Sequence, residues 1–328
     1  MNHFGNSFRI TIFGESHGPH IGINIDGCPP GIPLTEDDFA PDLDRRKPGA
    51  RGTTPRKEDD SPEIVSGCYK GFTTGAPLTV LFANKNVRSG DYDHLRNRPR
   101  PGHADFVAAK RFMGFNDPRG GGHFSGRLTL ALVAAGVVAK KLLEGVDINA
   151  RLIKAGDRFD IAAAVEEAMA AGDSIGGLVE CRATNIPVGW GEPFFDPVES
   201  VISHLAFAVP AIKGIEFGSG FAAAAMKGSE HNDAIVDESG KTATNNAGGI
   251  SGGLTNGNEL LFRVAVKPTS SISKEQKTLN VKSGEMEALE VKGRHDACIA
   301  LRVPVVIEAI TAIALADLNL QAKTLLSS

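Results

Sequence analysis

The chain has 328 residues, of which 41% are hydrophobic and 23% charged, and its formal net charge is −4 at pH 7. These values are ordinary for a soluble globular protein, and the acidic balance argues against a nucleic-acid-binding protein. The N-terminus lacks the pattern of a secretory signal, and no uninterrupted apolar stretch of about 18 residues predicts a membrane span. Cys28, Cys68, Cys181 and Cys298 have no metal-ligand spacing. We therefore expect free thiols, no bound metal and a cytoplasmic location.

The first predicted elements are two strands, at 8–13 and 21–25, where apolar residues alternate around a glycine-containing turn. Thr35 is followed by three acidic residues, which predicts the N-cap of a helix that ends in the basic run 45–47. In later segments, apolar residues that alternate predict strands, and apolar residues spaced by three or four positions predict helices. They predict strands at 64–66, 78–83, 178–184 and 260–266, and helices at 104–115, 128–143, 162–171, 198–208 and 305–318.

Two segments without periodicity, 88–102 and 243–257, are expected to be loops. Strands and helices do not alternate regularly along the chain, which disfavours a doubly wound parallel sheet. We expect one α+β domain over residues 1–328, in which buried helices pack against antiparallel sheets.

Cations, histidines and glycines gather in short clusters that contain few apolar residues and are therefore not expected to form the hydrophobic core. Clustered guanidinium groups and bare backbone amides suit small, highly charged anions, and neutral imidazole beside them indicates proton chemistry. The basic segment 45–57 has two other interpretations, a solvated charged face or a nucleic-acid patch, although it lacks interleaved aromatic residues. The clusters lie at 14–18, 45–51, 98–105, 119–127, 245–249, 267–271 and 293–296.

Several of these motifs have more than one interpretation. Residues 14–18 match GxSxG, but a second strand follows where a Ser16 nucleophile would need a helix, so the turn is expected to present His17. The segment 119–127, with its triple glycine, is expected to open a helix whose N-terminus favours an anion. Arg46 is expected in a cation cluster without acidic partners, and Asp296 is either a base or a cap.

Six short strings, in order over nearly the whole chain, resemble the motifs of the chorismate synthase family. The resemblance implies a lyase of the shikimate pathway and of aromatic amino acid biosynthesis. The reaction converts 5-enolpyruvylshikimate-3-phosphate to chorismate and phosphate by anti-1,4-elimination, and it uses reduced FMN without net redox change. A helical core sandwiched between two antiparallel β-sheets and a homotetramer are implied as well. The strings are FGESHG at 13–18, DRRKPG at 44–49, RPGHAD at 100–105, RGGG at 119–122, KPTSS at 267–271 and GRHD at 293–296.

The same resemblance implies roles for individual residues. His17, His103 and Asp296 would be the catalytic acid and base groups, and Arg46, Arg51 and Arg127 would bind the anionic groups of the substrate. The residues expected to contact FMN are His123, Phe124, Ser125, Pro210, Ala211, Gly252, Lys267, Pro268, Thr269, Ser270, Ser271 and Arg294.

One segment departs from the family pattern. Many members read Arg-Ser-Ser-Ala-Arg-Glu-Thr after the triple glycine, whereas residues 123–129 read His-Phe-Ser-Gly-Arg-Leu-Thr. The chain has no room for a separate flavin reductase domain, so we expect an external source of reduced FMN. Two rival hypotheses remain: a flavin oxidoreductase that transfers hydride at the same site, and an RNA-binding protein that uses the basic segment.

Overall fold

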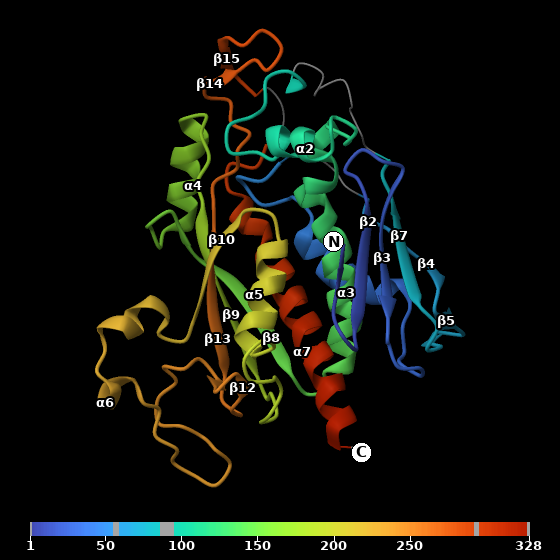
Figure 1. Cartoon of the computed structure of the whole chain (residues 1–328), viewed down its shortest axis with the longest axis vertical. Helices are drawn as coiled ribbons and strands as arrows, with labels where there is room; N and C mark the ends of the chain where they lie inside the picture. The colour runs from blue at the N-terminus through green and yellow to red at the C-terminus, as the bar shows by residue number, and fades with distance from the viewer. Residues whose placement is uncertain (1, 55–58, 86–94, 292–294, 327–328) are drawn as a thin grey trace.

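The first of two larger sheets in this computed structural model is antiparallel, with strand order β1-β2-β3-β7-β4 (Figure 1). The structure describes residues 2–54, 59–85, 95–291 and 295–326. Ile21, Ile23 and Ile25 alternate along β3 and are fully buried, because successive side chains of a strand point to opposite faces. The strands are β1 (His3–Phe4), β2 (Arg9–Gly14), β3 (His20–Asp26), β4 (Pro62–Ser66) and β7 (Leu78–Ala83).

The second sheet is also antiparallel and has the order β10-β13-β9-β8. Its central strand β13 buries Phe262 and Val264 completely. Three short hairpins lie outside the two sheets: β5–β6, β11–β12 and β14–β15. The bounds are β8 (Asp147–Ala155), β9 (Gly177–Thr184), β10 (Ile212–Phe217) and β13 (Leu260–Val266), then β5 (Cys68–Tyr69), β6 (Phe72–Thr73), β11 (Ile250–Ser251), β12 (Leu254–Thr255), β14 (Gln276–Leu279) and β15 (Met286–Leu289).

The long helices lie between the two sheets (Figure 1). Helix α3 packs on β2 and β3, α7 packs on β8 and β9, and α3 and α7 pack on each other, while α5 covers β10 and α7. The α-helices are α1 (Ala40–Arg46), α2 (Asp105–Arg111), α3 (Thr129–Leu142), α4 (Ile161–Ala170), α5 (Val198–Ala208), α6 (Gly228–His231) and α7 (Pro304–Leu326), and short 3-10 segments include η1 (Glu36–Phe39), η3 (Arg119–Phe124), η4 (Gly126–Leu128), η5 (Gly220–Ala225) and η6 (Ile299–Arg302).

Helices α3 and α7 meet closely because small residues face each other. A Cβ atom built on Gly136 of α3 would lie 2.4 Å from Cβ of Ala309 on α7. The stretch Pro304–Lys323 is also long and apolar enough to cross a membrane, which the sequence prediction missed. Because 83% of its most apolar window is buried inside the protein, it serves here as a core helix.

Most predicted elements are confirmed, including all the long helices and the strands of both sheets that alternate clearly. Thr35 and Asp38 form the capping box expected before α1. The α+β class is confirmed by the helices and antiparallel sheets. Cys28, Cys68, Cys181 and Cys298 are free thiols, as expected.

Two local predictions were wrong, and two strands of the second sheet were missed. Helix α2 ends at Arg111 rather than 115, because Met113 and Gly114 take positive φ angles of 54° and 79°. The glycine-rich segment 243–257 is not loop throughout, since it contains the hairpin β11–β12. Strands β8 and β10 were not predicted. The predicted loop 88–102 falls partly outside the described residues.

Candidate active site

A cavity with a volume of about 760 Å³ lies where β1, β2, the C-terminal end of α5 and the beginning of α7 meet. Its size is typical of sites for small ligands. Four cationic side chains line it, together with one carboxylate, that of Asp296. This excess of positive charge attracts polyanionic ligands. The cations are Arg46, Arg127, Lys267 and Arg302.

The triple glycine at 120–122 lies against two of the predicted catalytic histidines. Its three φ angles are 60°, 84° and 54°, values that residues with a side chain rarely adopt. A Cβ atom on Gly120 would lie 2.6 Å from Cδ2 of His17, and one on Gly121 would lie 3.2 Å from Cε1 of His103. Glycine therefore allows this backbone to pass beside both imidazole rings, which come from distant parts of the sequence.

Residues 119–127 lead into helix α3, as predicted, but they do so through irregular 3-10 turns. Residues 119–124 form an irregular 3-10 segment, and α3 begins only at Thr129. The glycine N–H groups are therefore not the free donors of a helix N-terminus, and their function is close approach to the histidines.

His103 is held by a partly buried pair with Asp105. Its Nδ1 lies 2.7 Å from Oδ1 of Asp105. Arg100 donates Nε and Nη2 to the two Asp105 oxygens, each at 2.8 Å, and Nη1 to the Ser271 hydroxyl at 3.0 Å. Burial alone would raise the pKa of the Asp105 carboxyl, but the hydrogen bonds from Arg100 and His103 lower it overall. The ionised carboxylate fixes the ring so that its Nε2 edge faces the glycine loop.

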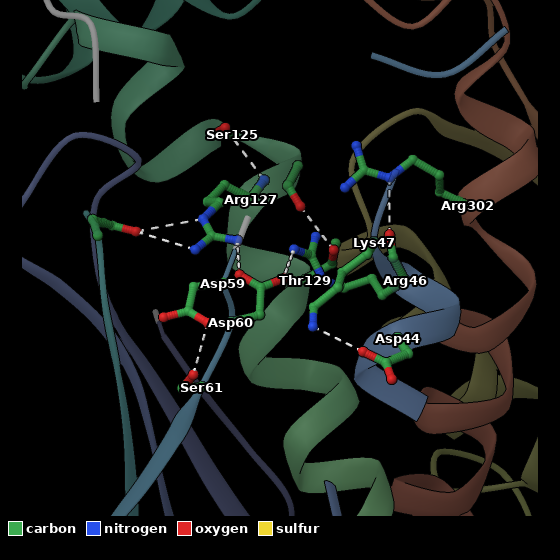
Figure 2. A network of polar contacts seen from close by, with 12 residues as sticks. Asp44, Arg46, Lys47, Asp59, Asp60, Ser61, Ser125, Arg127, Thr129 and Arg302 are labelled. Atoms are coloured by element: carbon green, nitrogen blue, oxygen red, sulfur yellow. Dashed lines mark hydrogen bonds and ion pairs between the residues drawn. The ribbon is translucent and has the colours of Figure 1, made fainter. Parts of the chain in front are cut away.

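Two cavity guanidinium groups share one buried carboxylate, that of Asp60 (Figure 2). Arg46 donates Nη2 to Oδ2 of Asp60 at 2.8 Å, and Arg127 donates Nη1 to Oδ1. The Ser125 hydroxyl accepts the backbone N–H of Arg127 at 3.3 Å. The expectation that Arg46 has no acidic partner was therefore wrong, because the partner comes from a later segment of the chain.

The Asp296 carboxylate lies in the cavity wall between two donors. Its Oδ1 accepts the backbone N–H of Thr54 at 2.9 Å, and Nη1 of Arg302 lies 3.5 Å from its Oδ2. Arg302 also donates Nε to the carbonyl oxygen of Arg46 at 2.9 Å. Asp296 and Arg302 are each about 12% exposed, so a ligand in the cavity can reach them while bulk water is largely excluded.

The segment Lys267–Ser271 forms another part of the wall. Lys267 donates Nζ to the carbonyl oxygen of Gly102 at 2.9 Å and to the Ser270 hydroxyl at 2.8 Å. Burial lowers the pKa of the Lys267 ammonium, and the nearby charge of Lys213 lowers it further. Among the described residues, the buried hydroxyl oxygen of Thr269 has no hydrogen-bond partner.

His123 connects three segments at the rim of the cavity. Its Nδ1 lies 2.8 Å from the carbonyl oxygen of Gly14, and its Nε2 lies 3.1 Å from Oδ1 of Asn2. Phe124 is 41% exposed and presents an aromatic ring to the cavity. The departure from the family pattern at 123–129 therefore affects contacts within the protein as well as the lining.

The structure brings most of the predicted site residues together. Those that line the cavity are His103, Asp296, Arg46, Arg127, His123, Phe124, Ser125, Pro210, Ala211, Lys267, Pro268, Thr269, Ser270 and Ser271.

Three predicted residues are not part of this lining, and a fourth lies outside the described residues. His17 is 5% exposed and lies directly behind it. Arg51 is exposed and pairs with Glu166, with Nη2 at 2.7 Å from Oε2, so its anion-binding role stays a prediction. Gly252 lies in the turn of the β11–β12 hairpin. Arg294 lies outside the described residues.

Sequence reasoning missed several residues of the site. Arg302 interrupts an apolar run before α7, which was a usable signal. Arg100 was noticed in its motif but given no role, although it anchors Asp105. His204 lies on α5 with its ring 5.4 Å from that of Phe4, and both line the cavity. No sequence pattern predicts the contact between His204 and Phe4, because this contact depends on how β1 packs against α5.

Comparison with known proteins identifies the family of this chain. A family model described as chorismate synthase matches residues 8–320. The chain is 65% identical to the chorismate synthase of Chitinophaga pinensis over 321 residues, covering 98% of this chain and 97% of that protein. It is 45% identical to a chorismate synthase of Dehalococcoides mccartyi over 353 residues, covering 98% and 97%. A crystal structure of chorismate synthase superposes with a TM-score of 0.75 at 25% identity, covering 97% of this chain and 93% of that chain. The chain therefore belongs to the chorismate synthase family.

Proposed function

We propose that the cavity is where this chain eliminates phosphate from 5-enolpyruvylshikimate-3-phosphate, with reduced FMN bound in the same space. The chain is a carbon–oxygen lyase of the shikimate pathway and forms chorismate. The observation that carries the location is the convergence of Arg46, Arg127 and Arg302 with His103 and Asp296 around one cavity. We also infer that the two sheets and the helices between them form the family's β-α-β sandwich as a single domain.

The charge of the lining matches the charge of the substrate. The substrate has one phosphate and two carboxylates, so several guanidinium groups are needed to replace the water that it loses on binding. Arg46 and Arg127 supply two of them from a partly buried position, where electrostatic attraction is stronger than in bulk water. Guanidinium forks also orient phosphate and carboxylate groups through paired hydrogen bonds.

The remaining wall of the cavity fits a flavin nucleotide. Lys267 offers a cation for its phosphate, and the unpartnered Thr269 hydroxyl and the exposed ring of Phe124 offer a polar and an apolar contact. With Ser125, Pro210 and Ala211, these residues would hold the cofactor. When bound, reduced FMN supplies transient electron donation and takes up a proton at N5.

Three side chains would control protons around the bound ligands. His17 would donate a hydrogen bond or a proton to the departing phosphate, His103 would stabilise negative charge, and Asp296 would accept a proton. The Asp105 carboxylate, 2.7 Å from Nδ1 of His103, fixes the orientation of the ring. General acid–base groups of this kind each contribute about 10²–10⁴-fold to a rate.

We infer a homotetramer from the family resemblance, and the distance of Gly252 from the cavity of its own subunit supports contact between subunits. Gly253, in the same hairpin turn, accepts the backbone N–H of Val198 at 2.9 Å, which places the hairpin at the N-terminal end of α5. The cavity is at the other end of this helix of 11 residues, about 16 Å away. If Gly252 contacts FMN as the family resemblance implies, it does so in a neighbouring subunit. A cytoplasmic location and an external source of reduced FMN complete the proposal.

An anaerobic assay with dithionite-reduced FMN tests the proposed function. We expect stoichiometric release of phosphate and chorismate, catalytic use of the flavin and no consumption of NAD(P)H. Oxidised FMN in air is expected to give no turnover. Net oxidation of NAD(P)H coupled to a reduced product would instead support the flavin oxidoreductase, and RNA retention that weakens with salt would support the RNA-binding protein.

A further inference from the structure

The Asp60 carboxylate is the most deeply buried acidic group beside the cavity, and the proposed chemistry does not use it. Its side chain is 0% exposed, while those of its partners Arg46 and Arg127 are 3% and 10% exposed. Asp60 takes a left-handed backbone conformation, with φ 51°, which aspartate tolerates better than most residues. The chain therefore accepts an uncommon backbone geometry to bring one carboxylate between two guanidinium groups.

Each oxygen of this carboxylate binds a different arginine. Oδ2 accepts Nη2 of Arg46 at 2.8 Å and Oδ1 accepts Nη1 of Arg127, so the carboxylate spans the gap between the two cations (Figure 2). Burial alone would raise the pKa of Asp60, but the positive charges of Arg46 and Arg127 lower it overall, so the group stays ionised at neutral pH. Without it, the two guanidinium groups would repel each other across a site that water scarcely enters.

The contacts continue from Arg127 to the turn that contains His17. Nε and Nη2 of Arg127 both lie 3.4 Å from Oδ1 of Asn84. The amide nitrogen of Asn84 donates to the carbonyl oxygens of Glu15 at 3.1 Å and Gly18 at 2.9 Å, on the two sides of His17. A shift of Arg127 would therefore first change the anion-binding contacts of Arg127 itself and then, to a smaller extent, move this turn.

We propose that Asp60 is a positioning residue that fixes the spacing of Arg46 and Arg127, and thereby sets the affinity of the cavity for its polyanionic substrate. The proposal rests on the function proposed above. Asp60 does not itself touch the substrate, since it does not line the cavity. It also leaves this pair of arginines with one net positive charge, so an incoming anion meets two aligned donors whose mutual repulsion is already cancelled.

The experiment compares Asp60→Asn with a matched control, Glu308→Gln. Glu308 is likewise a buried carboxylate that binds two cations, accepting Arg45 at 2.6 Å and Lys140 at 3.3 Å, but it lies outside the cavity lining. Both substitutions remove a buried charge and are expected to lower the thermal midpoint. Only Asp60→Asn is expected to raise the Michaelis constant for 5-enolpyruvylshikimate-3-phosphate, by at least about tenfold, with a maximal rate reduced by less than about threefold.

A second variant separates position from charge and covers poor folding of the first. Asp60→Glu keeps the charge but moves the carboxylate by one methylene, so positioning predicts a raised Michaelis constant together with a thermal midpoint nearer to that of the wild type. Wild-type Michaelis constants in both Asp60 variants, or an equal rise in Glu308→Gln, would overturn the proposal. Failure of the proposed function is distinguishable, because the wild-type protein would then release no phosphate at all.

Discussion

Gly120 and His17 lie so close that a Cβ atom on the glycine would stand 2.6 Å from the imidazole carbon Cδ2 and 2.7 Å from Nε2. The same atom would stand 2.8 Å from the hydroxyl oxygen of Ser16. This contact explains why a glycine follows Arg119 in a segment that makes no regular helix. The position of His17 relative to the cavity therefore depends on the absence of a side chain at residue 120.

We predict that Gly120→Ala lowers the maximal rate by at least about tenfold. The φ of 60° strains any residue with a Cβ atom, and the methyl group must displace His17 or Ser16. Steady-state turnover and a thermal melt measure the effect. Gly228→Ala is the control, because nothing lies within 4 Å of the corresponding Cβ position. A wild-type rate in Gly120→Ala would show that the loop yields without moving the histidine.

We predict that Asp105→Asn destabilises the protein by about 2 kcal/mol at pH 7, since it weakens charge-assisted hydrogen bonds to Arg100 and His103. The folded state holds the pKa of Asp105 below its unfolded value of about 3.9. The stabilisation is therefore complete above that pH and is lost as the pH falls through the folded pKa. The difference between wild type and variant should stay constant from pH 7 to about 5 and shrink below about 4.

Denaturant unfolding at several pH values tests this dependence. Asp26→Asn serves as a comparison, because Asp26 pairs with Arg9 on the exposed surface and its loss is expected to matter less. A constant difference between wild type and Asp105→Asn down to the acid limit of folding would contradict the assignment.

The parts of the fold that the sequence predicts are those in which one pattern dominates. Residues 130–139 are apolar on all sides, so a buried helix was evident. Strand β8 was missed because the alternation along Asp147–Ala155 breaks at Ile153 and Lys154, where the pairing with β9 shifts register. The β11–β12 hairpin was missed because a glycine-rich composition hides two-residue strands, which depend on pairing rather than on propensity.

The candidate site shows the same division between local and long-range information. The motifs around His17, His103 and Asp296 are visible in the sequence, and their resemblance to a family supplies roles. The ion-pair partners of these residues are not visible in the sequence. Arg46 pairs with Asp60 and Asp296 with Arg302, and in both pairs tertiary packing brings the two segments together. Arg51 illustrates the opposite case: it belongs to a basic motif but lies on the surface beside Glu166, so its role stays a prediction.

We predict a homo-oligomer, with a tetramer as the expected form. The position of the β11–β12 hairpin at the far end of α5 from the cavity is consistent with a contribution to a neighbouring subunit. Light scattering at micromolar concentration measures the mass directly. A monomer with full activity would contradict both the assembly and the shared use of Gly252.

The last prediction concerns Asp296, whose carboxylate is held by the Thr54 backbone and by Arg302. Asp296→Asn keeps the shape and the hydrogen bond from Thr54 but removes the base. We expect the maximal rate to fall by about 10²-fold, while the Michaelis constant and FMN affinity change little, which is the pattern of a lost proton-transfer group.

Arg302→Met separates this role from a structural one. It removes the cation beside Asp296 and the hydrogen bond to the Arg46 carbonyl but keeps the carboxylate base, so it should lower the maximal rate less than Asp296→Asn does. If Asp296→Asn instead melts far below the wild type and its folded fraction retains full specific activity, Asp296 is a cap for the segment before α7 and the proton leaves by another group.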